Sequence, residues 1–362
     1  MKKVWLAMLV AALWLAACGP TAEPTATAEP TAKPSAEEGR ILTVMTHDSF
    51  DMSEEIINLF QQKCRCRVQF LKSGDTGLML NQALLSKENP LADVLYGVDN
   101  TFLSRALEGD ILEPYDSPLL ENIPPEMQLD PSHRLLPVDY GDVCVNYDKN
   151  WFRERDLLPP ADLPDLLQPA YRGLTVVENP ATSSPGLAFL LATIGRFGKD
   201  GYLDFWAALR DNDLLVAEGW EDAYWGNFTY ASQGGDRPIV VSYASSPPVE
   251  VYFSESQFDE APTGVITADG SCFRQIEFVG ILKGTPNRDL AEQWIDFMLD
   301  TDFQENIPLT MFVFPANRQA TLPDVFVRFA QVPAKPATVP PEDIEAHREE
   351  WIRAWTQTVL RR

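Results

Sequence analysis

The sequence predicts an α/β protein of two lobes, with mostly parallel sheets, crossing strands and a central ligand cleft. Three successive strand-helix units occupy residues 41–100, a long apolar strand follows at 137–147, and a second strand-helix region begins at residue 175. Repeated alternation of strands and helices is typical of a parallel sheet whose binding loops share one edge.

The N-terminal segment predicts export and attachment to a membrane. Residues 1–17 read as a lipoprotein signal peptide: a basic start, an apolar run at 4–15, and Leu15-Ala16-Ala17 before Cys18. This pattern resembles the lipobox of bacterial lipoproteins, in which Cys18 is lipidated; the alternative is an ordinary signal peptide with an incidental cysteine. The apolar run is too short for a bilayer, which needs about 20 residues. Residues 18–39, rich in Pro, Thr, Ala and Glu, predict a disordered tether.

The charge and cysteine content narrow the ligand class. With 29 basic and 53 acidic residues, the formal charge of −24 disfavours nucleic acid and anionic membrane surfaces and is compatible with a cationic ligand. Cys64 and Cys66 form a C-x-C motif, which lacks the four-ligand spacing of a zinc site, and Cys144 and Cys272 stand far apart. We therefore predict no metal site and no cofactor, and the redox state of these cysteines stays open.

The first lobe is expected to present polar loops at one sheet edge. Strands are predicted at 41–45, 67–71 and 92–96, with helices at 52–62 and 78–87. A polar segment follows each strand, and in open α/β sheets ligands bind at that edge. The segments contain two candidate ligand-binding residues, His47 and Asp75, although Asp75 could equally cap the following helix.

The second lobe is expected to contribute a loop rich in hydroxyl groups. Residues 137–147 predict a crossing strand, and a strand at 175–177 leads through Thr182, Ser183 and Ser184 into an apolar helix at 187–194. Hydroxyls and free amides at a helix N-terminus can bind an anion or an oxygen, whereas capping needs only one of the three. The chain then returns through a strand at 275–282, a helix at 289–299 and a C-terminal helix at 340–360. These elements divide the body into lobe 1, residues 40–140 and 275–362, and lobe 2, residues 141–274.

The stretch 216–246 is the main candidate for ligand recognition. Aromatic rings beside carboxylates suit a flat cation, because a ring face attracts a cation by about 0.5 to 2 kcal/mol. Core packing is the alternative explanation for any one ring. An apolar strand at 238–241 then delivers Ser242 and Tyr243. The rings are Trp220, Tyr224, Trp225, Phe228 and Tyr230, and the carboxylates are Glu218, Glu221 and Asp222.

Eight segments in order resemble the thiamine-binding protein of bacterial ABC importers, a two-lobe, type II solute-binding protein. The resemblance spans the chain after the tether. It implies a periplasmic-binding-protein-like fold, a monomer that closes on thiamine or its phosphates outside the cytoplasm, and delivery to an ABC permease and ATPase. The segments are T-H-D-S-F, C-R-C, A-D-V-L-Y-G-V-D-N, P-V-D-Y-G, N-P-A-T-S-S-P-G-L, G-W-E-D-A-Y, V-S-Y-A-S-S-P and I-P-L-T-M-F-V-F-P-A-N.

The resemblance also implies a set of ligand-binding residues. Trp220 and Tyr243 would embrace the flat rings, Asp75 would take a charged or amino edge, and the Ser183/Ser184 loop would receive the hydroxyethyl or phosphate end. The family usually has Tyr at the position of His47, Trp at that of Phe312 and Tyr at that of Val249. The implied set is His47, Asp75, Ser183, Ser184, Trp220, Tyr243 and Phe312.

Two alternatives to a thiamine receptor remain at this point. One is a binding protein for another cationic small molecule, such as a thiamine precursor pyrimidine or a polyamine. The other is a thiamine-degrading enzyme of the same fold that uses Cys144 as nucleophile near Asp139 and Asp142. A nucleophilic cysteine needs a lowered pKa and a nearby base, which a sequence does not display. We expect a binding protein without catalytic residues.

Overall fold

The computed structural model describes residues 39–254 and 259–361. The predicted signal peptide at 1–17, the predicted lipidation site Cys18 and the predicted tether as far as residue 38 lie outside this range. Within it, no helix has the length and apolar character needed to cross a membrane.

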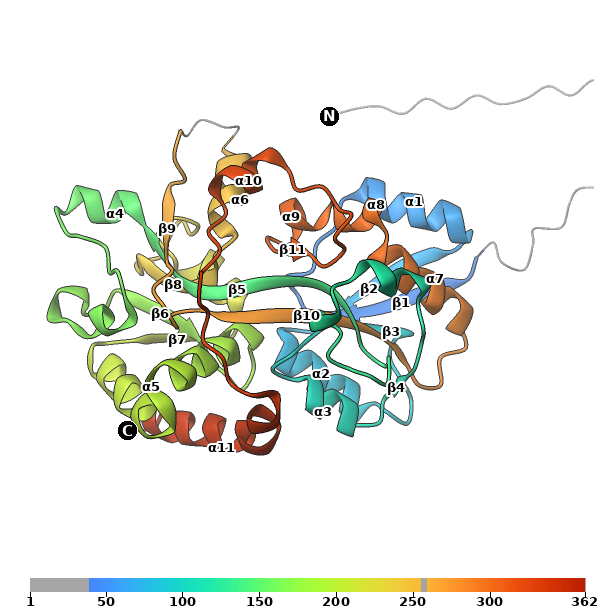
Figure 1. Ribbon diagram of the computed structural model, residues 1–362, viewed down its shortest axis with the longest axis horizontal. Helices are drawn as coiled ribbons and strands as arrows, with labels where there is room; N and C mark the ends of the chain where they lie inside the picture. Colours follow the sequence, from blue (N-terminus) through green and yellow to red (C-terminus); the bar gives the residue numbers. More distant parts are fainter. Residues whose placement is uncertain (1–38, 255–258, 362) are drawn as a thin grey trace, which may run out of the picture. The chain divides into compact units, whose positions relative to one another are not determined.

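The strands form one mixed sheet in the order β2, β1, β3, β10, β5, β8, β6, β7, with β4 on β10, and β9 and β11 on β5 (Figure 1). Pairing is parallel at both ends, but antiparallel around β5 and β10. The α/β class is confirmed, whereas the expectation of mostly parallel pairing is wrong, because the two long strands run in opposite directions. The strands are β1 Ile41–Thr46, β2 Arg67–Lys72, β3 Val94–Asp99, β4 Leu112–Glu113, β5 Leu136–Asp148, β6 Thr175–Glu178, β7 Leu215–Ala217, β8 Ile239–Tyr243, β9 Thr263–Ile266, β10 Phe273–Leu282 and β11 Phe314–Pro315.

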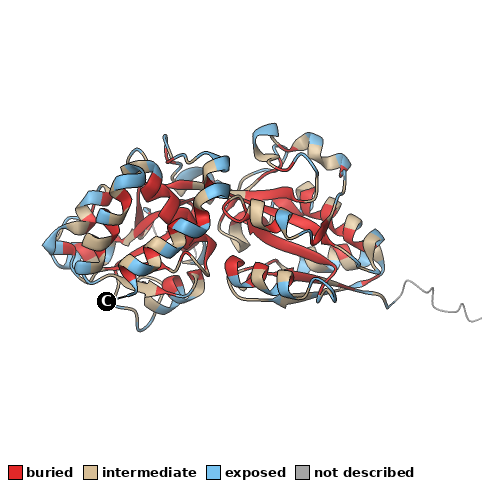
Figure 2. Cartoon of the chain, turned by 90° about the horizontal axis from the view of Figure 1, so that it is seen from below, coloured by how far each residue is buried: buried red, intermediate tan, exposed pale blue. Residues whose placement is uncertain are grey.

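The helices surround this sheet, with their exposed faces outward and the buried strands at the centre (Figure 2). Short 3₁₀ turns occupy 118–122, 125–127, 163–167 and 169–171, and a π-helical segment spans Asp222–Asn227. The α-helices are α1 Glu54–Cys64, α2 Thr76–Leu85, α3 Leu103–Glu108, α4 Lys149–Glu154, α5 Ser184–Asp211, α6 Ser246–Phe253, α7 Arg288–Leu299, α8 Thr301–Gln304, α9 Ile307–Thr310, α10 Asp324–Phe329 and α11 Pro341–Val359.

The two predicted crossing strands are β5 and β10, which lie side by side and link the β1–β3 side of the sheet to the β6–β8 side (Figure 1). A disulfide between Cys144 on β5 and Cys272, just before β10, ties the same pair of strands. A second disulfide joins Cys64 to Cys66 at the end of α1. The structure thus supplies the pairing that the sequence left open.

Several helix boundaries differ from the predicted ones. Helix α2 begins at Thr76 rather than residue 78, because Asp75 caps it. Helix α5 continues to Asp211, far beyond the predicted end at 194, with a kink at Gly198, where φ is 76°. A glycine tolerates this left-handed backbone, so the chain bends there and continues as helix.

The C-terminal helix α11, which we expected in lobe 1, packs against α5 of lobe 2, and its Arg348 also lies over the Phe102 ring of lobe 1, 5.6 Å from the centroid. The Trp355 ring meets Trp206 edge-on at 5.5 Å between centroids, and Arg210 Nη1 donates to the Thr358 carbonyl at 2.6 Å. Trp355 is fully buried. The apolar face of this helix could be predicted from the sequence. The surface that it covers could not, because the residues of that surface lie far away along the chain.

Candidate functional site

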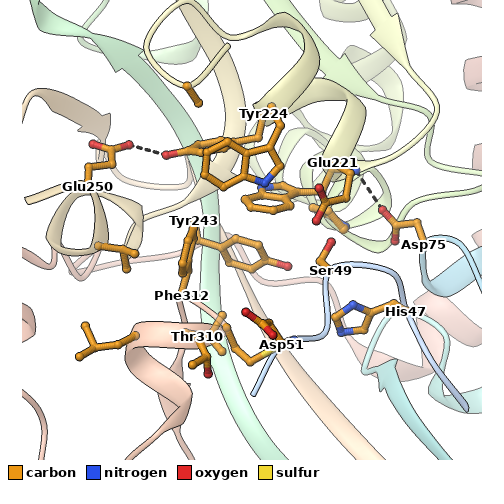
Figure 3. A pocket seen from close by; sticks show the side chains of 18 of the residues that line it. His47, Ser49, Asp51, Asp75, Glu221, Tyr224, Tyr243, Glu250, Thr310 and Phe312 are labelled. Atoms are coloured by element: carbon orange, nitrogen blue, oxygen red, sulfur yellow. Dashed lines mark hydrogen bonds between the residues drawn. The ribbon is translucent and has the colours of Figure 1, made fainter. Parts of the chain in front are cut away.

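A cavity of about 680 Å³ lies where the loop after β1, the starts of α2 and α5, the segment 220–231, helix α6 and the segment 309–313 meet (Figure 3). The following residues line it: His47, Ser49, Asp51, Asp75, Thr76, Ser184, Pro185, Trp220, Glu221, Tyr224, Trp225, Tyr230, Ala231, Tyr243, Val249, Glu250, Phe253, Ser254, Glu277, Leu309, Thr310, Met311, Phe312 and Val313. The structure therefore brings together every residue of the implied set except Ser183.

Asp75 is both a helix cap and a wall of the cavity. Its Oδ1 accepts from the amides of Thr76, at 2.7 Å, and Ser184, at 3.1 Å, and its Oδ2 accepts from the amide of Trp220 at 3.1 Å. Burial raises the pKa of Asp75, and hydrogen bonds from Trp220, Ser183 and Ser184, together with the charge of His47, oppose the rise. One carboxylate thus joins the start of α2 to two segments of the second lobe.

The hydroxyl-rich loop before α5 is satisfied internally. Ser183 caps the helix, with its Oγ accepting from the Gly186 amide at 3.4 Å. Thr182 Oγ1 donates to the Glu218 carbonyl at 2.6 Å, and Ser184 Oγ accepts from Gln275 Nε2 at 2.7 Å. Since the Ser184 amide already donates to Asp75, the expectation of free amides at this helix start is wrong.

The aromatic stretch divides between the cavity wall and the core. Trp220 stacks on Tyr224 at 4.9 Å between centroids and 15° between planes, and its Nε1 donates to Ser242 Oγ at 3.0 Å. Trp225 lies at the edge of the cavity with 45% of its surface exposed, whereas Phe228 is fully buried in the core. Core packing therefore explains Phe228, whereas Trp220 and Trp225 are placed where a ligand in the cavity could touch them.

Phe312 closes the aromatic wall from the opposite side. Its ring meets Trp220 edge-on at 6.0 Å and 82°. Its backbone adopts φ of 63°, a left-handed conformation that a bulky residue rarely takes. Ser245 Oγ donates to the Phe312 carbonyl and fixes this turn. Such conformations persist only where the surroundings impose them, often at binding sites.

An acidic pair on the crossing strands lies beside His47. Glu277 on β10 stands opposite Asp139 on β5, and its Oε1 lies 3.5 Å from His47 Nε2. Tyr96 Oη donates to Asp139 Oδ2 at 2.5 Å and to Glu277 Oε2 at 3.3 Å.

The environment pushes the pKa values of this group apart. Burial, followed by the Glu277 charge, holds the pKa of Asp139 well above its usual value. Burial would also raise the pKa of Glu277, but His47 lowers it. For His47, burial favours the neutral ring, yet Glu277 with Asp75 and Asp48 raises the pKa. Asp139 therefore keeps its proton to a higher pH than Glu277 does.

Tyr243 is oriented by a polar chain behind the cavity. Its hydroxyl donates to Gln275 Oε1 at 2.8 Å, and Gln275 Nε2 donates to Ser184 Oγ and to Asp99. Asp99 is buried, which raises its pKa to about 7. Because the three partners come from β10, α5 and the end of β3, this chain holds the Tyr243 ring in one position.

Glu250 closes the cavity at the end farthest from His47 (Figure 3). It accepts from the hydroxyls of Tyr224 and Thr263. Burial raises the pKa of Glu250 from 4.5 to about 7. The carboxyl group is therefore shared between its protonated and charged forms near neutral pH.

We expect this buried carboxyl to make folding depend on pH. The folded state binds the Glu250 proton more tightly than the unfolded state does. The stabilisation of the folded state by this protonated carboxyl is therefore complete below pH 4.5 and is lost as pH rises to about 7. The free energy of unfolding should fall over this interval by on the order of 1 to 3 kcal/mol through this group. Glu250→Gln should flatten that part of the profile in urea unfolding at stepped pH values; identical profiles for the two proteins would contradict the assignment.

The lining is strongly acidic. Asp51, Asp75, Glu221, Glu250 and Glu277 all face the cavity, and no Lys or Arg belongs to its lining among the residues that the structure describes. In the same part of the chain, no group of three or more His, Cys, Asp or Glu is arranged to hold a metal ion.

Cys144, the alternative nucleophile, lies outside this lining. It is fully buried and bonded to Cys272, so it presents no thiolate to the cavity. This finding removes the residue on which the enzyme alternative depended.

The sequence analysis missed Glu277 and Glu250, and it left Tyr224, Trp225 and Glu221 of the aromatic stretch out of the implied set. Glu277 did leave a signal, because it is the one charged residue within the apolar run Q-I-E-F-V-G-I-L. A carboxylate in a buried strand is costly unless it has a partner or a ligand. Glu250 follows S-P-P-V, which was not predicted to be helical, so its orientation was not accessible.

The fold and the cavity define a receptor for a small solute. The family model for bacterial extracellular solute-binding proteins matches residues 89–330. The chain belongs to this family, whose members bind solutes outside the cytoplasm.

Individual relatives narrow the comparison. The thiamine-binding periplasmic protein of Brucella suis biovar 1 (strain 1330) is 28% identical over 335 residues, which cover 91% of this chain and 95% of that protein. The protein of the same name from Escherichia coli (strain K12) is 28% identical over 326 residues, which cover 89% of this chain and 94% of that protein.

Solved structures share the fold. A periplasmic thiamin binding protein has a TM-score of 0.77 and 25% identity, covering 88% of this chain and 96% of its own. The periplasmic binding protein AfuA from Actinobacillus pleuropneumoniae, with fructose-6-phosphate bound, has a TM-score of 0.74 and 21% identity. The match covers 89% of this chain and 99% of the AfuA chain. At the latter identity the likeness concerns the fold alone.

Proposed function

We propose that this protein is an extracytoplasmic receptor that captures thiamine and delivers it to an ABC importer. The observation on which the proposal depends most is the cavity, in which the Trp220 and Phe312 rings stand beside carboxylates and no lining Lys or Arg is described. Thiamine is a flat, two-ring cation, which aromatic faces and acidic groups recognise together. The names of the relatives support the same ligand.

Each end of the cavity suits a different part of such a ligand. Trp220 and Tyr243 would contact the faces of the rings, while Glu277, paired with His47, would attract the thiazolium or the amino group. The cavity volume of about 680 Å³ lies within the usual range of about 300 to 1,000 Å³ for small-molecule sites. His47, Val249 and Phe312 replace larger rings of the resembled family, which leaves room for a related cation.

The cellular context of the proposal comes from the N-terminal sequence. Lipidation of Cys18 would attach the body to the membrane through the tether, and a permease with its ATPase subunits would receive the ligand. The body would act as a monomer, without a cofactor. The second candidate ligand is another flat or extended cation, a precursor pyrimidine or a polyamine, which the acidic lining also favours.

The test is a tryptophan fluorescence titration of the soluble body, residues 40–362, with thiamine, the precursor pyrimidine and a polyamine. Because Trp220 and Trp225 line the cavity, thiamine should quench fluorescence saturably. Mass spectrometry of the same samples should recover the ligand intact. If only the polyamine or the pyrimidine quenched the fluorescence saturably, that compound and not thiamine would be the ligand. Breakdown of thiamine during the titration would show that the protein is not purely a receptor.

A further inference from the structure

We propose that Glu250 forms a second polar subsite, which recognises the aminopyrimidine edge of the ligand at the end of the cavity opposite His47. The inference rests on the proposed function and adds a specificity-determining residue to it. It also assigns a direction to the ligand, with the aminopyrimidine toward Glu250 and the cationic ring toward Glu277. Glu250 is not among the residues that the family resemblance implies.

Glu250 belongs to the wall of the cavity and yet is almost fully buried. It lies on helix α6, and only 7% of its surface is exposed. Figure 3 places its carboxyl group on the opposite side of the aromatic rings from His47 and Asp75. The cavity therefore has acidic groups at both ends and an aromatic band between them.

The carboxyl group of Glu250 is oriented by two neutral donors. Tyr224 Oη donates to its Oε1, and Thr263 Oγ1 donates to its Oε2. A carboxylate offers about four acceptor positions, so about two remain open for a ligand. Lys149 is the cation whose charge acts on Glu250, but its Nζ donates to the Ala261 carbonyl at 2.8 Å.

Among the residues that the structure describes, Glu250 thus has hydroxyl partners and no salt bridge. A carboxyl group that is buried without a cationic partner costs stability. Such a group in the wall of a cavity is a candidate for function, because a ligand can supply the missing partner.

The wall beside Glu250 leaves room for a flat ring. Val249 lines the cavity where the resembled family usually has tyrosine, and Phe312 lines it where that family usually has tryptophan. Tyr224, whose hydroxyl holds Glu250, stacks on Trp220 at 4.9 Å between centroids. The carboxyl group therefore lies at the edge of the aromatic wall, where it meets the edge of a ring that packs against this wall.

An aminopyrimidine matches a carboxyl group in a way that a thiazolium does not. Its amino group is a donor and stands next to a ring nitrogen, which is an acceptor. A carboxyl group accepts from the amino group in either protonation state, and its protonated form also donates to the ring nitrogen. Two parallel hydrogen bonds of this kind fix orientation as well as adding affinity.

The thiazolium carries a full positive charge but no N–H group, so it is held by charge attraction and not by hydrogen bonds. It would lie at the other end of the cavity, where His47 lowers the pKa of Glu277 and so favours its carboxylate.

Calorimetric titration of the wild-type soluble body with thiamine and 4′-desaminothiamine tests the inference. The second compound has hydrogen in place of the amino group and keeps both rings. We expect thiamine to bind at least about tenfold more tightly, because the buried carboxyl group loses a donor in the analogue. Equal affinities would overturn the inference and leave the proposed function intact. If neither compound bound, both the inference and the proposed function would be overturned.

Variants of Glu250 assign this discrimination to its carboxyl group. Glu250→Leu removes both oxygens, so the ratio of the two affinities should fall below about threefold. Glu250→Gln presents an amide, which also accepts and donates, and should keep most of the ratio. The amino group and the carboxyl group are two halves of one interaction, so the effects of removing them should not add.

The matched control is Glu221→Leu. Glu221 lines the same cavity, but it lies on the side of Ser49 and His47 (Figure 3). This variant should leave the ratio within about twofold of the wild type even if it weakens both ligands.

Circular dichroism checks the fold of all three variants. If Glu250→Leu weakened both ligands equally, Glu250 would only shape the cavity and the inference would be overturned. A ratio that falls equally in Glu250→Leu and Glu221→Leu would overturn it as well. The ratio in the wild type tests recognition of the amino group even if a variant fails to fold.

Discussion

Trp220→Ala is expected to weaken thiamine binding by about 100- to 1,000-fold, or about 3 to 4 kcal/mol. Trp220 is 8% exposed, stacks on Tyr224 and meets Phe312 edge-on, so its removal takes away a ring face and loosens the other rings. Calorimetry on the soluble body measures the dissociation constant, and thermal unfolding reports how much stability is lost with the ring.

Two further substitutions show whether this effect belongs to binding. Trp225→Ala changes the same residue type at a half-exposed position on the edge of the cavity, and should cost less than about tenfold. Trp220→Phe keeps an aromatic face but loses the hydrogen bond to Ser242, and should retain most of the affinity. An unchanged dissociation constant in Trp220→Ala would mean that the stretch serves packing alone.

Gly77→Val is expected to weaken thiamine binding at least about 100-fold, although Gly77 does not itself line the cavity. Gly77 lies in the first turn of α2, and its amide donates to the Thr182 carbonyl of the second lobe at 3.1 Å. A Cβ at this position would stand 2.9 Å from the carbonyl oxygens of Ala181 and Thr182. Because both obstacles are backbone atoms, the two segments must separate, which also pulls Asp75 away from Ser184 and Trp220.

The control for this variant is Gly201→Val. Gly201 is also a helical glycine, but a Cβ there meets only Phe197 at 3.5 Å, an ordinary contact. Both variants gain a β-branched residue in a helix, so a difference in their affinities isolates the contact between α2 and residues 181–182. Small-angle scattering should show Gly77→Val remaining more open with saturating ligand. If it binds as tightly as Gly201→Val, the contact does not limit closure.

The sequence by itself determined the features that depend on neighbouring residues. The apolar runs at 137–147 and 275–282 identified β5 and β10, since strand periodicity is local. The clustering of Trp220, Tyr224 and Trp225 beside acidic residues pointed to the wall of the cavity, and the polar segments after the first strands pointed to His47 and Asp75.

Only the tertiary structure decided what those side chains do, because their partners are distant in the chain. Asp75 meets amides 109 and 145 residues away, so its choice between a ligand and the start of α5 is invisible in the sequence. The pKa of Glu277 is lowered because His47 lies beside it, and Cys144 is a disulfide partner because of Cys272. Burial, pKa values and hydrogen-bond partners depend on which segments the fold places side by side, whereas local sequence encodes only which element each residue enters.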